Sequence, residues 1–432
     1  MHLLRALTIT GVGLLLGSGG AYSDWEQAGQ AWQQGDYVSA LAQWQALAEA
    51  GDAAAQYNTA IMLLDGQGRL RDPPAARDWL QRAAAQNNPD AWFCLGYLLA
   101  QGRDVPRDDA RAAEWYRMAA AAGHAAAQLN LALLYRARRV SAGNDAEMVR
   151  LLRAASGQGL APAQFVLAEH YLQQDESDAA SVRQAVALYR AAAGQGHAPA
   201  QRQLGLMYLN GKELDADAGE AVAWLTQAAQ QNDADAQYYL GMLYRTGERI
   251  AQDPVQALRW LQAAAMQGHP RAQYHLGLIY REGFGVARDY NAAARWYRAA
   301  AELGEPRAQN NLGNLYVSGN GVPQDFVLAH KWFNLAAARG NENAVRNRDK
   351  LAGQLNDVQL AEAQRLARQW DRAHARSGRA GSAVPVLLGS DGEPAQAIDE
   401  ASGGTGAADD MHAWFGRWFG RDETVAQGVV EP

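Results

Sequence analysis

Histidines at repeated positions are the first residues of this chain whose type and spacing could support chemistry. His124, His197 and His269 each follow a glycine, and histidine can serve as a metal ligand or as a general acid–base. Such chemistry needs a second ligand or partner, commonly one helical turn away. His170 and His275, inside predicted helices, have no metal-ligating residue at that spacing. We therefore expect the three glycine-linked histidines to share a structural role at a turn between units.

Pairs of glycines in three loops resemble the turns that cradle phosphate groups. They are Gly66/Gly68, Gly283/Gly285 and Gly319/Gly321. A phosphate loop follows a strand and is completed by a third glycine or by Gly-Lys-Ser/Thr, whereas these pairs follow predicted helices and lack both. Asp215 and Asp217 begin like a calcium loop, but the remaining ligands do not follow. The sequence also lacks a zinc-protease His-Glu helix, a Gly-x-Ser-x-Gly motif and a Ser-x-x-Lys motif. We expect no cofactor, no metal and no enzymatic activity.

Composition places the chain among folded proteins that do not bind nucleic acid. Of the 432 residues, 48% are hydrophobic and 20% are charged, so most of the chain can bury a core. The formal net charge of −7 disfavours a partner with a phosphate backbone, which favours basic patches. The single cysteine, Cys94, excludes a disulfide framework and any zinc or iron–sulfur site built from cysteines of this chain alone. Cys94 falls in a predicted helix, where we expect a small buried apolar side chain.

The N-terminus has the pattern of an export signal, which we assign to residues 1–23. Met1 to Arg5 form a short positive start, and an apolar run extends from Ala6 to Leu16. The sequence Ala21-Tyr22-Ser23 then offers small residues where a signal peptidase cuts. The run is short for a bilayer span, so an uncleaved membrane anchor is the weaker alternative. We predict a periplasmic or secreted protein, cleaved near Ser23.

A repeat of 36 residues organises most of the chain. The tryptophans that mark it at this spacing include Trp224, Trp260, Trp296 and Trp332. An Ala-Gln pair opens seven units, at Ala55, Ala127, Ala163, Ala200, Ala236, Ala272 and Ala308, and Ala91 opens the remaining one. The unit that starts at Ala163 contains one extra residue. Eight units therefore run from residue 55 to residue 343.

The unit that starts at Ala236 shows how each repeat is expected to fold. Apolar residues at helical spacing form one stripe that ends at Gly247, and a second stripe follows Asp253 and Pro254. Asp253 is a good N-cap type, and the equivalent positions hold Asp72, Asp108, Asn144, Ser181, Asp217, Asp289 and Asp325. Glycines recur inside the first helix, at Gly96, Gly205, Gly241, Gly277 and Gly313. Because each would cost about 1 kcal/mol in an isolated helix, we expect two helices to approach closely at these glycines.

The repeat resembles the Sel1-like repeat family, which is related to tetratricopeptide repeats. The resemblance rests on A-Q-Y-Y-L-G-M-L-Y-R-T-G from Ala236 to Gly247 and on A-L-R-W-L-Q-A-A-A-M-Q-G-H from Ala257 to His269. It implies an all-α protein, a right-handed α-solenoid of antiparallel helix pairs that stack on one another and curve. The units from Ala127 and Ala163 carry leucine in place of the tryptophan, which predicts irregular packing between residues 136 and 182.

Capping segments are predicted on both sides of the repeats. Residues 24–54 are expected to form an N-terminal capping helix pair, and residues 344–376 one C-terminal capping helix with a polar face. Such segments shield the apolar faces that the ends of a stack leave open. Residues 377–432 begin with a stretch rich in Gly, Ala, Ser and Asp, which predicts a disordered tail.

Aromatic residues and arginines are predicted to line the concave surface of the stack, which we call the inner wall. Positions 3, 7 and 10 of each first helix lie opposite the packing stripe, the side that lines the concave surface in related solenoids. Aromatic and arginine side chains are common anchors of protein interfaces. We therefore expect a peptide or partner helix to bind there, with the arginines meeting acidic groups. The alternative is that positions 3 and 7 only pack between adjacent units. The candidate contact residues are Tyr57, Phe93, Tyr97, Phe165, Arg202, Tyr238, Met242, Arg245, Tyr274, Leu278, Arg281 and Asn310.

The tail contains a second candidate for binding, an aromatic motif at residues 411–420. Its large rings, Trp414, Phe415, Trp418 and Phe419, would share one face of a short helix. One interpretation is a docking motif that inserts into a groove, including the groove of this chain, or makes peripheral contact with a membrane surface. The alternative is a collapsed hydrophobic cluster on the surface of the repeats.

These patterns favour a non-enzymatic interaction scaffold or adaptor of the bacterial cell envelope that binds a protein or peptide partner. This class of function is what the resemblance to Sel1-like proteins implies. The alternative is an envelope hydrolase or a carbohydrate-binding accessory factor. A hydrolase would need clustered carboxylates at a cleft, whereas the acidic residues here fall mostly at cap positions or on solvated faces.

Overall fold

The computed structural model describes residues 19–102, 104–140, 145–174 and 178–380, which form twenty α-helices and no strand. The prediction of an all-α protein is therefore confirmed. The helices are α1 (Gly19–Gln33), α2 (Tyr37–Glu49), α3 (Ala53–Asp65), α4 (Pro73–Ala85), α5 (Pro89–Gln101), α6 (Asp109–Ala121), α7 (Ala125–Arg136), α8 (Asp145–Gly157), α9 (Ala161–Gln174), α10 (Ala179–Gly194), α11 (Ala198–Asn210), α12 (Ala218–Gln230), α13 (Ala234–Thr246), α14 (Pro254–Met266), α15 (Pro270–Glu282), α16 (Tyr290–Glu302), α17 (Pro306–Ser318), α18 (Phe326–Ala338), α19 (Glu342–Ala352) and α20 (Asp357–Ala380).

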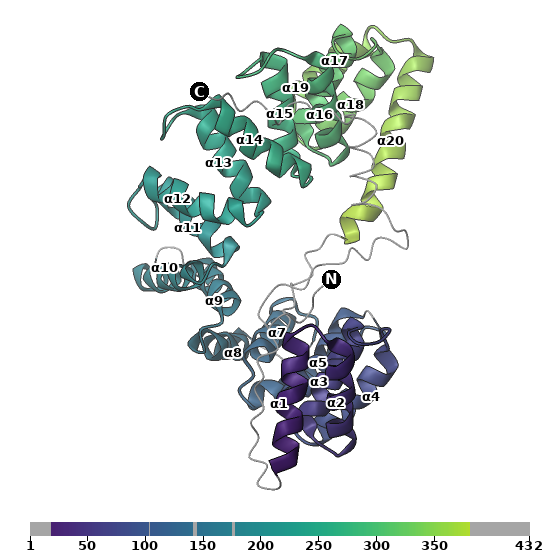
Figure 1. Cartoon of the computed structure of the whole chain (residues 1–432). Coiled ribbons are helices and arrows are strands. Elements are labelled where there is room, and N and C mark those ends of the chain that lie inside the picture. Colours follow the sequence, from purple (N-terminus) through teal and green to yellow (C-terminus); the bar gives the residue numbers. More distant parts are fainter. Residues whose placement is uncertain (1–18, 103, 141–144, 175–177, 381–432) are drawn as a thin grey trace, which may run out of the picture.

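Consecutive helices pack in pairs, and the pairs stack into an open arc (Figure 1). Each predicted repeat is one pair, from α3/α4 to α17/α18. In the middle of the arc, the first helices α9 and α11 lie on its inner side and the second helices α10 and α12 on its outer side (Figure 1). The predicted solenoid of helix pairs is confirmed, and in this part of the arc first helices supply the inner wall.

Aspartate side chains start the second helix of most pairs, as the sequence predicts. The carboxylate of Asp253 accepts hydrogen bonds from the backbone N–H groups of Val255 and Gln256, at 2.9 and 3.0 Å. Equivalent caps are formed by Asp72, Asp108, Asp217, Asp289 and Asp325. Asn144, the candidate cap of α8, lies outside the described residues.

The cap predicted at Ser181 is wrong, because α10 begins earlier. Asp178 is the N-cap, and its carboxylate accepts from the backbone N–H groups of Ala180 and Ser181 at 3.2 and 2.9 Å. α10 contains 16 residues, whereas the equivalent helix α14 contains 13. The insertion in this repeat therefore accompanies a longer helix, and the cap moves to an aspartate upstream.

The glycine-linked histidines occupy the N-cap positions of first helices, so their predicted structural role is confirmed. Nδ1 of His124 accepts a hydrogen bond from the backbone N–H of Ala127 at 3.2 Å, and Nδ1 of His269 accepts one from Ala272 at 3.1 Å. His197 occupies the same position at α11 without a side-chain cap bond. The imidazole thus replaces the usual carboxylate or hydroxyl as the acceptor at two helix starts.

Glycines inside the first helices mark the closest approach between paired helices. A Cβ atom added at Gly205 or Gly241 would lie 2.7 Å from Cγ of Leu225 or Leu261, far inside van der Waals contact. Gly96, Gly277 and Gly313 face Tyr116, Tyr297 and Phe333 in the same way. The expected close approach is confirmed, because the partner side chain fills the space that a Cβ atom would need.

The glutamine of each Ala-Gln pair is buried, and in the unit that starts at Ala236 it joins three helices. Nε2 of Gln237 donates to the carbonyl oxygen of Ala229 in the preceding α12, at 3.0 Å. Its Oε1 accepts a hydrogen bond from Nε2 of Gln267, at the end of α14, at 2.7 Å. Trp92 replaces this glutamine in the second repeat, where its indole N–H donates to the carbonyl of Ala84 at 3.1 Å. An indole cannot accept a hydrogen bond, and the donor position of that repeat is correspondingly Ala122.

The buried core is continuous in the first part of the chain and divided in the rest. One cluster extends from Ala28 in α1 to Leu167 in α9, and a second begins at Ala168. Three further clusters follow along the chain, the last reaching Trp370 in α20. The first boundary falls in α9, inside the region 136–182 for which the sequence predicts irregular packing.

The two ends of the repeats are covered by helices. At the N-terminus α1 packs against α2 as the predicted pair, and the predicted cleavage site at Ser23 falls within α1. At the C-terminus the single predicted helix is instead two, α19 and α20, separated by residues 353–356. Asn356 and Gln359 exchange backbone-to-side-chain hydrogen bonds of 2.9 and 3.1 Å, a capping box that starts α20 anew. α20 continues to Ala380, past the predicted limit of 376, and the aromatic motif at 411–420 lies outside the described residues.

None of the helices in the described ranges combines the length and the apolar character that a bilayer span requires.

Candidate interaction surface

The candidate contact residues of the first repeats expose little surface. Tyr57, Phe93 and Tyr97, which the sequence places among the contact residues, are 7%, 1% and 9% exposed. The ring of Phe93 stacks on the imidazole of His124 at 4.6 Å between centroids, and the ring of Tyr116 lies 5.9 Å away. These side chains pack against neighbouring rings and expose little surface, and their contact with a partner stays a prediction.

The inner wall of the later repeats is partly open. Leu278 and Asn310 are buried, at 9% and 8% exposure, so these two candidate residues also expose little surface. The remaining candidates in the repeats are half-buried and keep part of their surface in solvent: Phe165, Arg202, Tyr238, Met242, Arg245, Tyr274 and Arg281. The open part of the inner wall therefore extends over α9, α11, α13 and α15.

Aromatic rings on the inner wall also have a packing role here. The ring of Tyr238 stacks on the imidazole of His269 at 4.7 Å, and that of Phe165 lies 5.2 Å from His197. Each pair joins an aromatic residue of one repeat to the cap histidine of the next. Packing between repeats thus uses part of each ring, and only the remaining part is available to a partner.

A charged cluster joins α11, α13 and the start of α15. Arg202 lies 3.2 Å from Asp233 and 2.8 Å from Asp235, and Asp235 also lies 3.2 Å from Nε2 of His269. Burial raises the pKa of Asp233, against the opposing effect of Arg202. The hydrogen bond from His269 and the charge of Arg202 lower the pKa of Asp235. Asp235 is therefore ionised at neutral pH and holds two repeats together.

A second charged cluster joins α13 to α15. Arg245 lies 3.3 Å from Glu282 and 3.2 Å from Nδ1 of His275, and Arg281 lies 2.9 Å from Glu282. Burial, reinforced by the charge of Arg245, lowers the pKa of His275 to about 3, so this histidine is neutral at physiological pH. Arg245 and Arg281, which were predicted to bind acidic groups of a partner, both pair with Glu282 of this chain. A partner would therefore meet one net positive charge here.

Asparagine side chains replace the aromatic rings in the last repeat. Nδ2 of Asn347 in α19 donates to Oδ1 of Asn310 at 2.9 Å and to Oδ1 of Asn314 at 3.3 Å. Asn310 is therefore engaged with the C-terminal cap of the chain. Sequence reasoning missed Asn347, because it lies outside the eight repeats. Its separation of 37 residues in sequence from Asn310 is close to the repeat length of 36 and could have indicated it.

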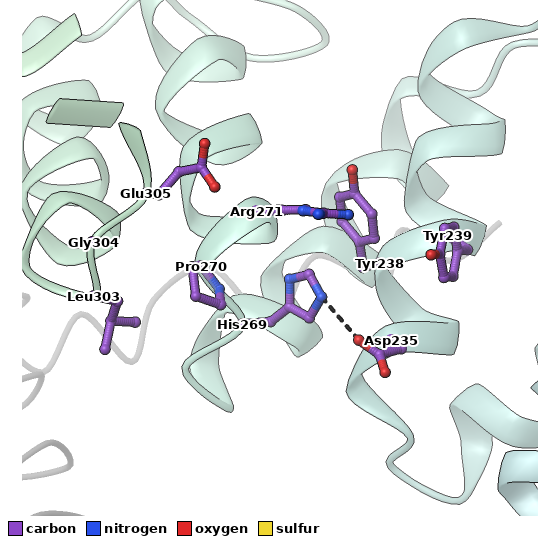
Figure 2. Close-up of a pocket in the computed structure, with 9 residues that line it drawn as sticks. All are labelled: Asp235, Tyr238, Tyr239, His269, Pro270, Arg271, Leu303, Gly304 and Glu305. Carbon is purple, nitrogen blue, oxygen red and sulfur yellow. Dashed lines mark hydrogen bonds and ion pairs between the residues drawn. The ribbon is translucent and has the colours of Figure 1, made fainter. Parts of the chain in front are cut away.

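A recess of about 400 Å³ opens beside the inner wall, at the starts of α13 and α15 and in the turn before α17. Its lining combines two tyrosines, three charged side chains, a histidine and an exposed leucine: Asp235, Tyr238, Tyr239, His269, Pro270, Arg271, Leu303, Gly304 and Glu305. Figure 2 shows the side chain of Arg271 extending toward Tyr238, and Asp235 joined to His269 nearby. Sequence analysis named only Tyr238 of this lining as a contact residue and His269 as a turn residue, since the recess needs three repeats to form.

The two carboxylates of the recess are engaged in structural roles. Asp235 is held by Arg202 and His269, and Glu305 accepts a hydrogen bond from the backbone N–H of Arg307 at 3.3 Å as the cap of α17. Neither is left as a free acid–base pair of the kind that a hydrolase uses. Within the described ranges, His, Cys, Asp and Glu side chains do not gather in threes at a distance suited to a metal ion. Cys94 is buried, and burial raises the pKa of its thiol to about 12, so it is not a reactive thiolate.

Comparison with known proteins places this geometry in a family. The Sel1 repeat model matches residues 53–88, 93–124, 161–197, 198–233, 234–269, 270–305 and 306–341. Residues 125–160 are outside these matches, although α7 and α8 form a helix pair there. No curated protein matches the sequence.

Two crystal structures extend the comparison to the whole solenoid. One is of c5321, a protective antigen of uropathogenic Escherichia coli, with 31% identity, a TM-score of 0.69, and coverage of 83% of this chain and 79% of that chain. The other is of a Sel1 repeat protein from Oxalobacter formigenes, with 29% identity, a TM-score of 0.54, and coverage of 81% and 98%. The seven matched repeats, which cover more than half of the chain, and this overall likeness show that the chain belongs to the Sel1 repeat family.

Proposed function

We propose that the protein is a non-enzymatic scaffold of the bacterial cell envelope that binds a protein or peptide partner on the open part of its inner wall. Sel1 repeats are generally protein–protein interaction modules, and that property supports the class of function. The observation that carries the proposal is the contrast between repeats. Equivalent aromatic positions are closed in the first repeats but half-open at Phe165, Tyr238 and Tyr274. An open row of aromatic and arginine side chains is a typical anchor surface.

The test uses the full chain in its own cells. Crosslinking followed by recovery of the tagged protein from envelope fractions should capture a partner, and Arg245→Glu with Arg281→Glu should reduce its recovery at least about ten-fold, the scale of an interface hot spot. The matched control is Arg183→Glu with Arg249→Glu, which reverses two exposed arginines elsewhere. Since Arg245 and Arg281 pair with Glu282, melting curves must first show that the double variant remains folded. Met242→Gln is a second variant that alters the same surface without disturbing an ion pair. Equal recovery from all four proteins would contradict the proposal.

The envelope location is proposed from the N-terminal residues. Export through residues 1–23 should leave a mature chain that starts close to Asp24. Cell fractionation and sequencing of the mature N-terminus test this directly. A full-length chain that remains in the cytoplasm would contradict the location while leaving the partner-binding proposal standing.

A further inference from the structure

One face of α20 carries a row of arginines that is turned away from the repeats. The buried residues Ala363, Ala367 and Trp370 form the face that packs against α18. At about 100° per residue, positions 365, 368 and 372 fall on the opposite face of the helix. Figure 1 shows the second half of α20 extending past the repeats. The row consists of Arg365, Arg368 and Arg372, all exposed, and the sequence continues its spacing at Arg376 and Arg379.

The acids around this row do not balance its charge. Glu362 pairs with Arg365 at 2.7 Å, and Asp371 pairs with Arg339 of the repeats at 3.0 Å. Arg368 and Arg372 form no ion pair with another residue of the described ranges. The charged residues of the repeats that contact Trp370 are Arg339 and Glu302. Together with residues 362–380 they hold six basic and three acidic side chains, so this part of the surface has an excess of positive charge.

The helix dipole does not account for the whole row. A helix C-terminus stabilises cations, but the effect falls off within the last turn. Arg365, Arg368 and Arg372 lie more than two turns before Ala380, where α20 ends. The formal net charge of the chain is −7, so exposed arginines without acidic neighbours are also unusual for this protein. The row therefore favours an anionic occupant.

The segment that follows α20 in the sequence has the complementary charge. Residues 381–390 are uncharged and contain Gly381, Pro385 and Gly389, residue types that favour turns. At about 3.3 Å per extended residue these ten residues reach up to about 33 Å, which is enough for the chain to turn back along the helix. Residues 381–410 contain no lysine, arginine or histidine, and their acidic residues are Asp391, Glu393, Asp399, Glu400, Asp409 and Asp410.

The lengths of the two charged elements are similar. From Arg365 to Arg379 the helix axis advances about 21 Å, at 1.5 Å per residue. From Asp391 to Glu400 an extended chain advances up to about 30 Å. The first four acids can therefore lie along the row in the antiparallel direction, with Asp391 near the end of α20 and Glu400 near Arg365.

We propose that residues 391–400 dock antiparallel on the arginine row of α20 in the same molecule. A tethered segment is present at an effective concentration of the order of millimolar, and several charge pairs act together where one exposed pair contributes little. Docking turns the chain back toward the first half of α20. The aromatic motif at 411–420 then starts beside the last repeats instead of beyond the end of the helix. The proposal does not depend on the partner proposed above.

Photocrosslinking of the full chain tests this inference. The photoreactive residue p-benzoylphenylalanine replaces Ile398, and irradiation of dilute protein is followed by mapping of the crosslinked peptides. We expect crosslinks within one molecule to residues 360–372 of α20, the half of the helix that is remote from the start of the tail. Arg368→Glu with Arg372→Glu should reduce their yield at least about five-fold, as should 1 M salt, where the Debye length is about 3 Å.

Exposed arginines elsewhere supply the matched control for this variant. Arg183→Glu with Arg249→Glu makes the same change of charge far along the chain and should retain the yield. Melting curves check that α20 stays folded on the repeats when Arg368 and Arg372 are replaced. If they show a loss of stability, the variants of the acidic segment decide.

The acidic segment offers a second pair of matched variants. Asp399→Asn with Glu400→Gln leaves the repeats and α20 unchanged and should cause the same loss of crosslinking. Asp409→Asn with Asp410→Asn removes the same charge from outside the docking segment and should retain the yield. Crosslinks that map to other helices, that form only between molecules, or that persist at 1 M salt and in the Asp399/Glu400 variant would overturn the proposal.

A lipid surface is the other anionic occupant that the experiment distinguishes. Sedimentation with phosphatidylglycerol vesicles, compared with phosphatidylcholine vesicles, measures it on the same proteins. If the probe at Ile398 gave no crosslink to α20 while Arg368 and Arg372 were needed for binding to phosphatidylglycerol, the row would belong to a membrane surface and the proposal would be wrong.

Discussion

Gln267 donates its side-chain N–H to the side-chain oxygen of Gln237 at 2.7 Å. This oxygen is buried, and the bond gives it a hydrogen-bond partner. The same bond recurs from Gln231 to Gln201. One repeat after Gln267, the donor position holds Leu303, and Oε1 of Gln273 is buried without a partner. The chain thus contains its own comparison between a satisfied and an unsatisfied version of one contact.

Leu303→Gln is expected to stabilise the protein, because it supplies the missing donor to Gln273 and replaces a leucine that is 48% exposed. The gain should be about 1 kcal/mol, the usual net value of one hydrogen bond. The reciprocal change, Gln267→Leu, should destabilise the protein by about 1–3 kcal/mol, since it leaves Oε1 of Gln237 unsatisfied. Urea denaturation midpoints of both variants measure the effect, and a lower midpoint for Leu303→Gln would count against this reading of the contact.

Gly241→Ala is expected to destabilise the repeats by about 1–3 kcal/mol, because its Cβ would lie 2.7 Å from Cγ of Leu261. Gly194→Ala is the matched control, since Gly194 is also within a helix and an added Cβ there meets nothing within 4 Å. The control should stabilise α10 by up to about 1 kcal/mol, because alanine loses less entropy in a helix. Chemical denaturation of the two variants should therefore give midpoint shifts of opposite sign.

Lowering the pH below 6.5 should destabilise the protein through its buried neutral histidines. Burial lowers the pKa of His275 to about 3 and that of His197 to about 4, from an ordinary value of 6.5. The unfolded chain takes up protons below pH 6.5 that the folded chain does not, so stability falls with pH between 6.5 and these values. For His275 the loss between pH 7.5 and pH 5 should be about 2 kcal/mol. His275→Gln, which can still accept from Arg245, should show a smaller drop in melting temperature over this range; an unchanged drop would assign the effect to other groups.

Asp178→Ala should destabilise the start of α10, because it removes the side-chain acceptor for the backbone N–H groups of Ala180 and Ser181. Ser181→Ala should have a much smaller effect, because the Ser181 side chain only donates to the Asp178 carboxylate, at 2.7 Å. Amide hydrogen exchange in the first turn of α10 measures this locally. Faster exchange in Ser181→Ala than in Asp178→Ala would contradict this assignment and indicate that Ser181 is the cap.

Strict periodicity explains why most of the fold could be predicted from the sequence. Positions such as Gly241, Asp253 and His269 have a role within their own repeat or with its nearest neighbour, so residue type and spacing define that role. The cap at Asp178 and the break at residues 353–356 could not be predicted in this way, because both occur where the repeat spacing changes.

Exposure of the inner wall could not be predicted in the same way. Phe93 and Tyr238 occupy the same repeat position and both stack on a cap histidine, yet only Tyr238 remains half-open. The difference depends on how neighbouring repeats pack along the arc, which no single repeat specifies. The ion pairs of Arg202 and Arg245 follow the same logic, because their partners Asp235 and Glu282 come from the next repeat.

The division of the core gives the two parts of the arc different mechanical characters. Helices α1 to α8 share one continuous apolar core, whereas the helices from α10 onward are joined through several smaller cores. We therefore expect heat or denaturant to unfold the later repeats in several steps, before the first repeats unfold together. The repeats with the more exposed inner wall would then also be those whose curvature changes most easily when a partner binds.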